Sequence, residues 1–415
     1  MKKTILLCGL AVAAQVSHGY FNLLNDHPSP FIFQYFEPSP TYTTQAGFGN
    51  VGLSTGTQIN YNQDIMYQQA YWYRSKVNGV QDYREYQVCQ YVEQKVIGGT
   101  VIQTAVQDAF SLRSGLLFVM RYNIYPVSAN QCYVLVNTQV KNAANKAVQV
   151  DFYPYQDLQT SPISPQNDKV AWDASQSLFT YTNPGAEANV ATYRALTEFP
   201  IAYEAGKYTS LRGDLANNIV DEFLSSFVPA QAQDYATAMQ YRFTLQPGES
   251  RQYDFGVGYN MVAPKPSRVN ANLDFQGWAG GPGYSATYEL RDPSSGQTIE
   301  GGIGNLAADG TFWFTSGHGG VFDIAIKGEK HLRGIIRGVT LVPNASTNIS
   351  GTLFSGDANG DNVVSSDDYL LINENFDLNV GDFSWDARAD LNGDGTTNTD
   401  DYLLLSDNFD LVGED

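Results

Sequence analysis

The sequence predicts a mainly β protein that contains a large antiparallel β-sandwich, a small β-sandwich and a small α-helical domain. Three observations carry this prediction. Short runs rich in Tyr, Phe, Val and Thr fill most of the chain, and many alternate with period two. A proline-rich stretch interrupts them at residues 263–267, and a loop–helix unit is repeated further on. The length of 415 residues exceeds one ordinary core, so we expect several domains.

Residues 1–19 are predicted to be a signal peptide. Two lysines precede an apolar run at residues 4–14, which is too short to span a bilayer. Small residues favour cleavage after Gly19, and cleavage after Ala14 also fits. We therefore expect an exported chain, secreted or at the cell surface, with no transmembrane segment after cleavage. An uncleaved anchor is the alternative.

The large sandwich is expected to span residues 20–262. Its clearest strand patterns lie at residues 116–122, 132–140 and 148–155, and short helices are expected near residues 219–227.

Two cysteines of the mature chain, Cys89 and Cys132, each lie in a strand-like run. An exported protein can keep a disulfide, and closing a loop of about 40 residues would stabilise the fold by about 3–4 kcal/mol. Two separate buried thiols are the alternative, and the sequence leaves both open.

Residues 263–267 are predicted to be a linker, because two prolines fall within five residues. The small sandwich is expected to follow at residues 268–354, with alternating runs such as 321–326. A strand, an Asp309-Gly310 turn, a Phe-rich strand and a strand ending in Lys327-Gly328 occur in this order. This order resembles the carboxypeptidase-regulatory-like and Cna-B-like sandwich modules, which implies the same small sandwich fold.

The net charge of −19 is concentrated at one end of the sequence. Residues 356–415 contain 16 acidic residues and one basic residue, whereas the other 355 residues contain 27 acidic and 23 basic ones. The acidity argues against a nucleic-acid partner, because phosphate binding needs clustered Lys and Arg.

The acidic end contains an internal repeat. Residues 357–378 and 390–411 are offset by 33, and 13 of 22 positions are identical. Each copy opens with a twelve-residue loop whose odd positions carry oxygen side chains, the donors that Ca²⁺ prefers. The expected ligands, including the main-chain carbonyls of position seven, are Asp357, Asn359, Asp361, Val363, Ser365 and Asp368 in the first loop, and Asp390, Asn392, Asp394, Thr396, Asn398 and Asp401 in the second.

The loops predict two bound Ca²⁺ ions. Position six must turn sharply, which favours positive φ; Gly395 adopts it freely and Asn362 tolerates it. A helix should begin at the acids that end each loop. Without metal the three acids of a loop repel one another, so folding should be coupled to calcium. The alternative, an acidic surface without metal, is disfavoured by two loops in register.

Residues 355–415 resemble type I dockerin modules at these loop positions. In that family the module docks onto a cohesin, so the resemblance implies a cohesin-like or other cell-envelope protein as partner. Recognition there involves loop positions ten and eleven, which are Ser366-Asp367 and Thr399-Asp400 here. The acid at position eleven departs from the family pattern, so calcium binding carries over further than cohesin recognition.

Residues 20–262 resemble uncharacterised exported bacterial β-sandwich proteins. This resemblance implies a fold but no particular activity. The similar residues are 72–74, 151–157 and 245–248. A glycoside hydrolase would need two acids about 5–10 Å apart. Asp151 and Asp157 are six residues apart on one strand, so their Cβ atoms should be about 20 Å apart if the strand is fully extended. That distance is too long for a catalytic pair, unless Pro154 bends the chain. Other candidate acids are Asp173, Glu204 and Asp221.

A carbohydrate-binding role is supported by 27 Tyr, 22 Phe and 5 Trp, because exposed rings can stack on sugars. Such residues also fill sandwich cores, and Trp72 and Trp172 fit either use. We therefore predict an exported, calcium-binding and non-catalytic protein whose C-terminal module mediates attachment or assembly. The alternative is a polysaccharide-degrading or carbohydrate-binding component.

Overall fold

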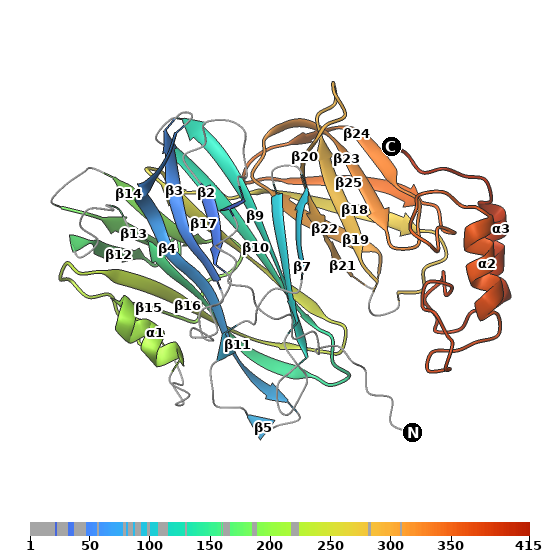
Figure 1. Cartoon of the computed structure of the whole chain (residues 1–415), viewed down its shortest axis with the longest axis horizontal. Helices are drawn as coiled ribbons and strands as arrows, with labels where there is room; N and C mark the ends of the chain where they lie inside the picture. Colours follow the sequence, from blue (N-terminus) through green and yellow to red (C-terminus); the bar gives the residue numbers. More distant parts are fainter. Residues whose placement is uncertain are drawn as a thin grey trace.

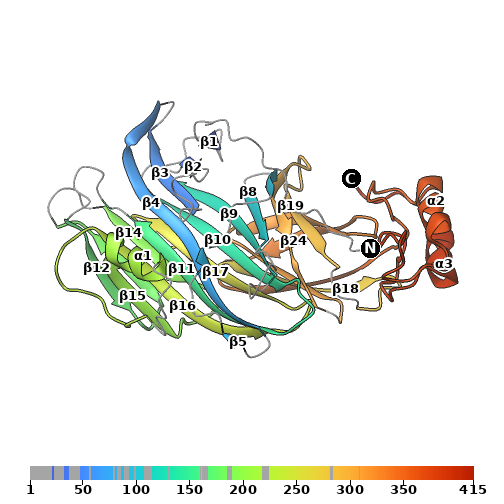
Figure 2. The same ribbon diagram turned by 60° about the horizontal axis from the view of Figure 1, so that its bottom comes forward.

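The computed structural model describes residues 115–415, apart from residues 129–130, 159, 161–166, 185–188, 217–223, 281–283 and 308. Before residue 115 it describes only the strands β1 to β8. The described chain is mainly β, as predicted, with several antiparallel sheets. The large sandwich, the small sandwich and a pair of short helices follow one another along the long axis (Figures 1 and 2).

The large sandwich has two sheets. The nine-stranded sheet contains β1 (Phe21–Asn22), β2 (Ile32–Phe36), β3 (Gly47–Thr55), β4 (Gln58–Val77), β5 (Val80–Gln81), β6 (Tyr86–Gln87), β11 (Val148–Leu158), β15 (Ala202–Lys207) and β16 (Tyr235–Leu245). The eight-stranded sheet contains β7 (Glu93–Ile97), β8 (Thr100–Val106), β9 (Leu116–Ser128), β10 (Gln131–Asn142), β12 (Lys169–Asp173), β13 (Leu178–Thr182), β14 (Val190–Ala195) and β17 (Ser250–Tyr259).

Aromatic residues fill the space between these sheets. Tyr71 of β4 stacks on Phe152 of β11 at 5.8 Å between ring centroids, and Phe118 of β9 approaches the same Phe152 from the opposite sheet. Strand propensity and core filling thus come from the same residues, because aromatic side chains suit a pleated surface with one buried face.

The helix α1 (Tyr208–Ala216) covers the outer face of the nine-stranded sheet (Figure 2). Leu211 and Leu215, one turn apart, pack on Trp72 and Tyr153. The sequence did not predict this helix; short helices were expected near residues 219–227. Residues 224–227 are not helical, and residues 217–223 lie outside the described part.

The small sandwich packs two four-stranded sheets. One contains β18 (Ser267–Phe275), β21 (Asn305–Leu306), β22 (Thr311–Ser316) and β25 (Ser346–Leu353); the other contains β19 (Ala286–Arg291), β20 (Thr298–Ile303), β23 (Gly320–Gly328) and β24 (Gly334–Leu341). The first and last strands, β18 and β25, pair in parallel, so they close the sheet next to each other.

The two sandwiches meet at a buried polar joint centred on Glu300 of β20. This carboxylate accepts hydrogen bonds from Tyr125 Oη (2.7 Å), Ser316 Oγ (2.8 Å) and Tyr288 Oη (3.0 Å). Ala263, in the stretch expected to be a linker, is fully buried and packs with Tyr125. Residues from both domains thus complete one another's hydrogen bonds at this joint.

A second polar group in the same joint surrounds Asp254 of β17. Its carboxylate accepts hydrogen bonds from Gln252 Nε2 (2.6 Å), Asn137 Nδ2 (2.8 Å) and Thr315 Oγ1 (3.1 Å). Burial raises the pKa of Asp254, and the bonds from Asn137 and Gln252 and the charge of Arg121 oppose that rise.

Several predictions concern residues outside the described part. These are the signal peptide at residues 1–19, Cys89 and Asp221; Cys132 lies in β10, but its side chain is not described. In the described part of the chain, no helix is long and apolar enough to cross a membrane.

Candidate metal centre

The helices α2 (Ser366–Asn375) and α3 (Thr399–Asp407) begin where the two acidic loops end. Ser365 and Asn398 are their N-caps, and each accepts a hydrogen bond from a main-chain N–H of the first turn. In return Asp368 and Asp401 accept from the N-cap N–H groups, both at 2.8 Å. This reciprocal capping box explains why the helices start at these residues.

Inside each loop the first aspartate organises the turn. Asp357 accepts hydrogen bonds from the N–H groups of loop positions four and six at 2.8 and 3.0 Å, and Asp390 does the same at 2.9 and 3.0 Å. The positive φ expected at position six is confirmed, with 72° at Asn362 and 92° at Gly395. The two copies therefore fold their loops in the same way.

The two repeats pair reciprocally through their main chains. Val363, at position seven of the first loop, forms a β-bridge with Val412, which follows α3. Thr396, at position seven of the second loop, forms the equivalent bridge with Asn379, which follows α2. Each loop is thus completed by the segment that follows the other helix.

Each loop buries two of its carboxylates. Asp357, Asp368 and Asp401 are fully buried, and Asp390 is nearly so. Burial raises the pKa of Asp368, and the charges of Asp357 and Asp361 raise it further. Burial likewise raises the pKa of Asp401, and the charge of Asp390 acts in the same direction. Each loop therefore concentrates negative charge that a cation would stabilise.

The donor set of the loops fits a hard cation. Each loop offers three carboxylates, an amide oxygen, a hydroxyl or second amide oxygen, and the main-chain carbonyl of position seven, all of them oxygen ligands. Among the described residues, no three His, Cys, Asp or Glu side chains form a metal-binding group by themselves. Calcium binding at these loops therefore stays a prediction.

Three candidate catalytic acids of the large sandwich, Asp151, Glu204 and Asp173, are bound to other protein groups. Asp157 is buried in β11. Asp151 Oδ1 pairs with Arg242 Nε at 2.7 Å, and its Oδ2 pairs with Arg74 Nη2 at 3.1 Å. Glu204 accepts a hydrogen bond from the N–H of Ser225 at 2.8 Å, and Asp173 accepts from Ser175 and Gln176, its close neighbours in sequence. These contacts stabilise strands and turns, and none of them joins Asp151, Glu204 and Asp173 to one another.

The tryptophans considered as sugar platforms contribute to packing instead. Trp72 is buried beneath α1. Trp172 stacks on Tyr203 at 4.3 Å between ring centroids and contacts Phe179 at 4.5 Å. Trp72 therefore packs the outer face of the nine-stranded sheet, and Trp172 packs, partly buried, against the sandwich core.

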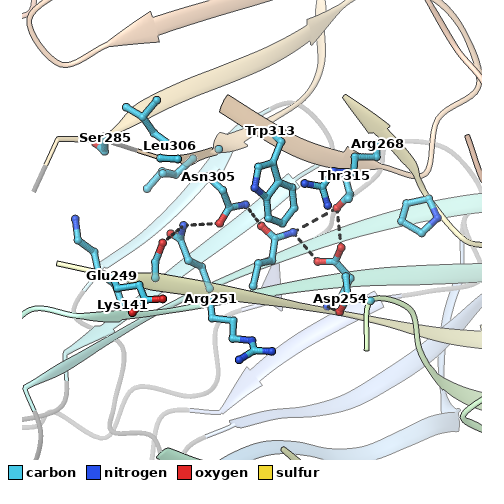
Figure 3. A pocket seen from close by; sticks show the side chains of 18 of the residues that line it. Lys141, Glu249, Arg251, Asp254, Arg268, Ser285, Asn305, Leu306, Trp313 and Thr315 are labelled. Carbon is cyan, nitrogen blue, oxygen red and sulfur yellow. Dashed lines mark hydrogen bonds between the residues drawn. The ribbon is translucent and has the colours of Figure 1, made fainter. Parts of the chain in front are cut away.

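A cleft of about 980 Å³ lies beside the joint between the sandwiches (Figure 3). Trp313 lines it with the Arg268 guanidinium 3.9 Å from its ring centroid, and Arg251 pairs there with Glu198 at 2.6 Å. This cleft was not predicted from the sequence, although the alternation of inward and outward side chains in β22 could have shown that Trp313 faces outward. Phe312 and Phe314 face the core, so Trp313 between them must face outward.

No protein family's sequence profile matches the chain, and no curated protein matches it. Among solved structures, a chain of a type II cohesin–X-dockerin complex from Acetivibrio cellulolyticus is 19% identical over 35% of this chain and 97% of that chain, with a TM-score of 0.29. A polysaccharide lyase is 10% identical over 78% of this chain and 47% of that chain, with a TM-score of 0.35. A galactose mutarotase-like protein from Lactobacillus casei is 8% identical over 58% of this chain and all of that chain, with a TM-score of 0.33. At such scores the likeness is too distant to carry a function to this chain.

Proposed function

We propose that this chain is an exported, non-catalytic attachment or assembly protein whose C-terminal module, residues 355–415, binds two Ca²⁺ ions. The observation that supports it best is the identical internal hydrogen bonding of two loops that bury four aspartates. Asp357, Asp361 and Asp368 would hold one ion together with Asn359, Ser365 and the carbonyl of Val363. The equivalent residues, 33 positions later, would hold the second. Calcium would neutralise these acids and fix the loops.

Attachment is proposed to use the exposed face of α2 and α3, which lie at the end of the molecule far from the large sandwich (Figure 1). Equivalent residues of the two copies are equally accessible: Tyr369 and Tyr402 are both 40% exposed, and Leu370 and Leu403 are 52% and 50% exposed. An apolar face of this kind suits a protein partner that buries it. A cohesin-like or other cell-envelope protein fits this description.

A calcium titration of the full chain tests the metal proposal. We expect calorimetry to give two bound ions, and chelator to reduce the helical circular dichroism of α2 and α3. The double variant Asp361→Ala with Asp394→Ala removes one exposed ligand from each loop and should abolish binding while the sandwiches stay folded. A wild-type chain that binds no calcium, with an unchanged spectrum in chelator, would refute the proposal.

Retention of cell-envelope proteins by the immobilised full chain tests attachment. We expect retention with calcium and its loss both in chelator and in the double variant Leu370→Glu with Leu403→Glu. Equal retention by that variant would show that the helix face is not used. The N-terminal sequence of the secreted chain would test export, with Tyr20 or Gln15 expected first.

The cleft beside Trp313 supports the second candidate, a carbohydrate-binding component. It combines an accessible indole with charged and amide side chains, which suits an oligosaccharide. Depletion of soluble polysaccharides by the full chain, compared with its Trp313→Ala variant, would reveal binding. Release of reducing sugars would instead indicate the hydrolase.

A further inference from the structure

Two lysines of the small sandwich contact the acidic loops, and each lysine binds the first residue of one loop. Lys327, near the end of β23, places Nζ 2.5 Å from Oδ2 of Asp357. Lys330, in the turn after β23, donates to the main-chain oxygen of Asp390. The two loops are copies of one another, whereas the two lysines belong to a single segment outside the repeat.

The two lysine contacts differ in chemical kind. Lys327 pairs with the carboxylate that is expected to bind the ion, whereas Lys330 binds a main-chain carbonyl. Within the loops, Asp357 and Asp390 accept the same pair of main-chain N–H groups. Both ammonium groups act on the loops by charge, since that of Lys330 also interacts with Asp390 and Asp401, but only that of Lys327 binds a carboxylate oxygen of a first ligand.

The pair of Lys327 and Asp357 is held in place and shielded from water. The side chain of Asp357 is 0% exposed and that of Lys327 is 16% exposed, so salt screens their interaction weakly. Lys327 Nζ also donates to the main-chain oxygen of His331 at 2.9 Å. A charge held by these acceptors and by the main-chain oxygen of Gly328 acts on the loop continuously.

We propose that Lys327 lowers the calcium affinity of the first loop below that of the second, so that the small sandwich regulates the module through one ammonium group. The inference rests on the proposed calcium binding. Its physical reason is that the ammonium of Lys327 donates directly to an oxygen of a ligand carboxylate and so competes with the cation for that oxygen, which Lys330 does not do at the second loop. The loops should therefore fill in sequence, the second before the first.

Single-loop variants of the full chain make the test specific. Asp394→Ala silences the second loop, and Asp361→Ala silences the first; both residues are exposed position-five ligands. In the Asp394→Ala background we expect Lys327→Met to raise the calcium affinity about fivefold, the effect of losing one nearby charge. In the Asp361→Ala background the same substitution should leave the affinity unchanged. Calorimetry measures both.

Two controls separate charge from packing. Lys327→Arg keeps the charge and should restore the low affinity of the first loop. Lys146→Met removes an equal charge from an exposed site on the large sandwich and should change nothing. If the chain binds two ions and Lys327→Met changes neither affinity, this inference is overturned while the proposed calcium binding stands. A chain that binds no calcium would instead refute the proposed function.

Discussion

The small sandwich contacts a neighbouring domain on each side, and each contact buries an acidic residue: Glu300 of the small sandwich on one side and Asp357 of the first loop on the other. The two joints stabilise these buried charges with different groups. Facing the large sandwich, Glu300 accepts hydrogen bonds from three neutral hydroxyl groups. Facing the loops, Asp357 meets an ammonium group and lies beside further acids. In the first joint Nε2 of His318 also lies 3.7 Å from Glu300, so protein groups surround that carboxylate. The second keeps an excess of negative charge, so its stability should depend on a cation.

The largest expected effect would break the first joint. Glu300→Ala should destabilise the chain by about 3 kcal/mol or more, because the buried hydroxyls of Tyr125, Tyr288 and Ser316 lose their acceptor. Denaturant unfolding with saturating calcium measures this loss. Glu374→Ala, an exposed helix position, is the matched control. Equal midpoints for both variants would show that the joint does not depend on Glu300.

A smaller effect should distinguish the second joint by its pH dependence. Burial lowers the pKa of His331 from 6.5 to about 4, and the charges of Lys327 and Lys330 contribute. Between pH 6.5 and 4 the unfolded chain binds a proton that the folded chain refuses, so stability should fall by about 2 kcal/mol as the pH drops. His331→Gln, which stays neutral, should lose less stability over that range. Unfolding midpoints at pH 7.5, 5.5 and 4.5 measure the difference. Parallel losses in both proteins would contradict this prediction.

The smallest effect should come from the rim of the cleft. Arg251 and Glu198 are about 40% exposed, and such ion pairs contribute at most about 1 kcal/mol. Glu198→Ala should therefore shift the denaturant midpoint slightly, and added salt should remove the shift. If Glu198→Ala lost as much stability as Glu300→Ala, the exposed ion pair would contribute as much to the joint as the buried hydrogen bonds of Glu300, which would contradict this prediction.

The features that sequence analysis predicted depend on neighbouring residues. Strand periodicity predicted β10 and β11, and the spacing of acids predicted where α2 and α3 begin. The helix α1 was not predicted, because its apolar face is only Leu211 and Leu215, a short signal whose partners lie on distant strands.

The features that sequence analysis missed depend on distant residues. Tyr125 and Glu300 are 175 positions apart, and Lys327 lies 30 positions before Asp357. Without knowledge of the packing, nothing in the pattern around Lys327 distinguishes it from an ordinary lysine at a strand end. The candidate acids of the large sandwich were hard to judge for the same reason, since the arginines that neutralise Asp151 lie on two other strands.

The reciprocal pairing of the repeats sets an order in time. During synthesis the second loop follows soon after its partner, because Asn379 precedes Thr396 by 17 positions. The first loop must wait, because Val363 pairs with Val412. A ribosome therefore releases the first loop long before the segment that completes it. The module can finish folding only once residues 410–413 have emerged from the ribosome. A folded module therefore requires that the chain from the first loop to residue 413 has been synthesised.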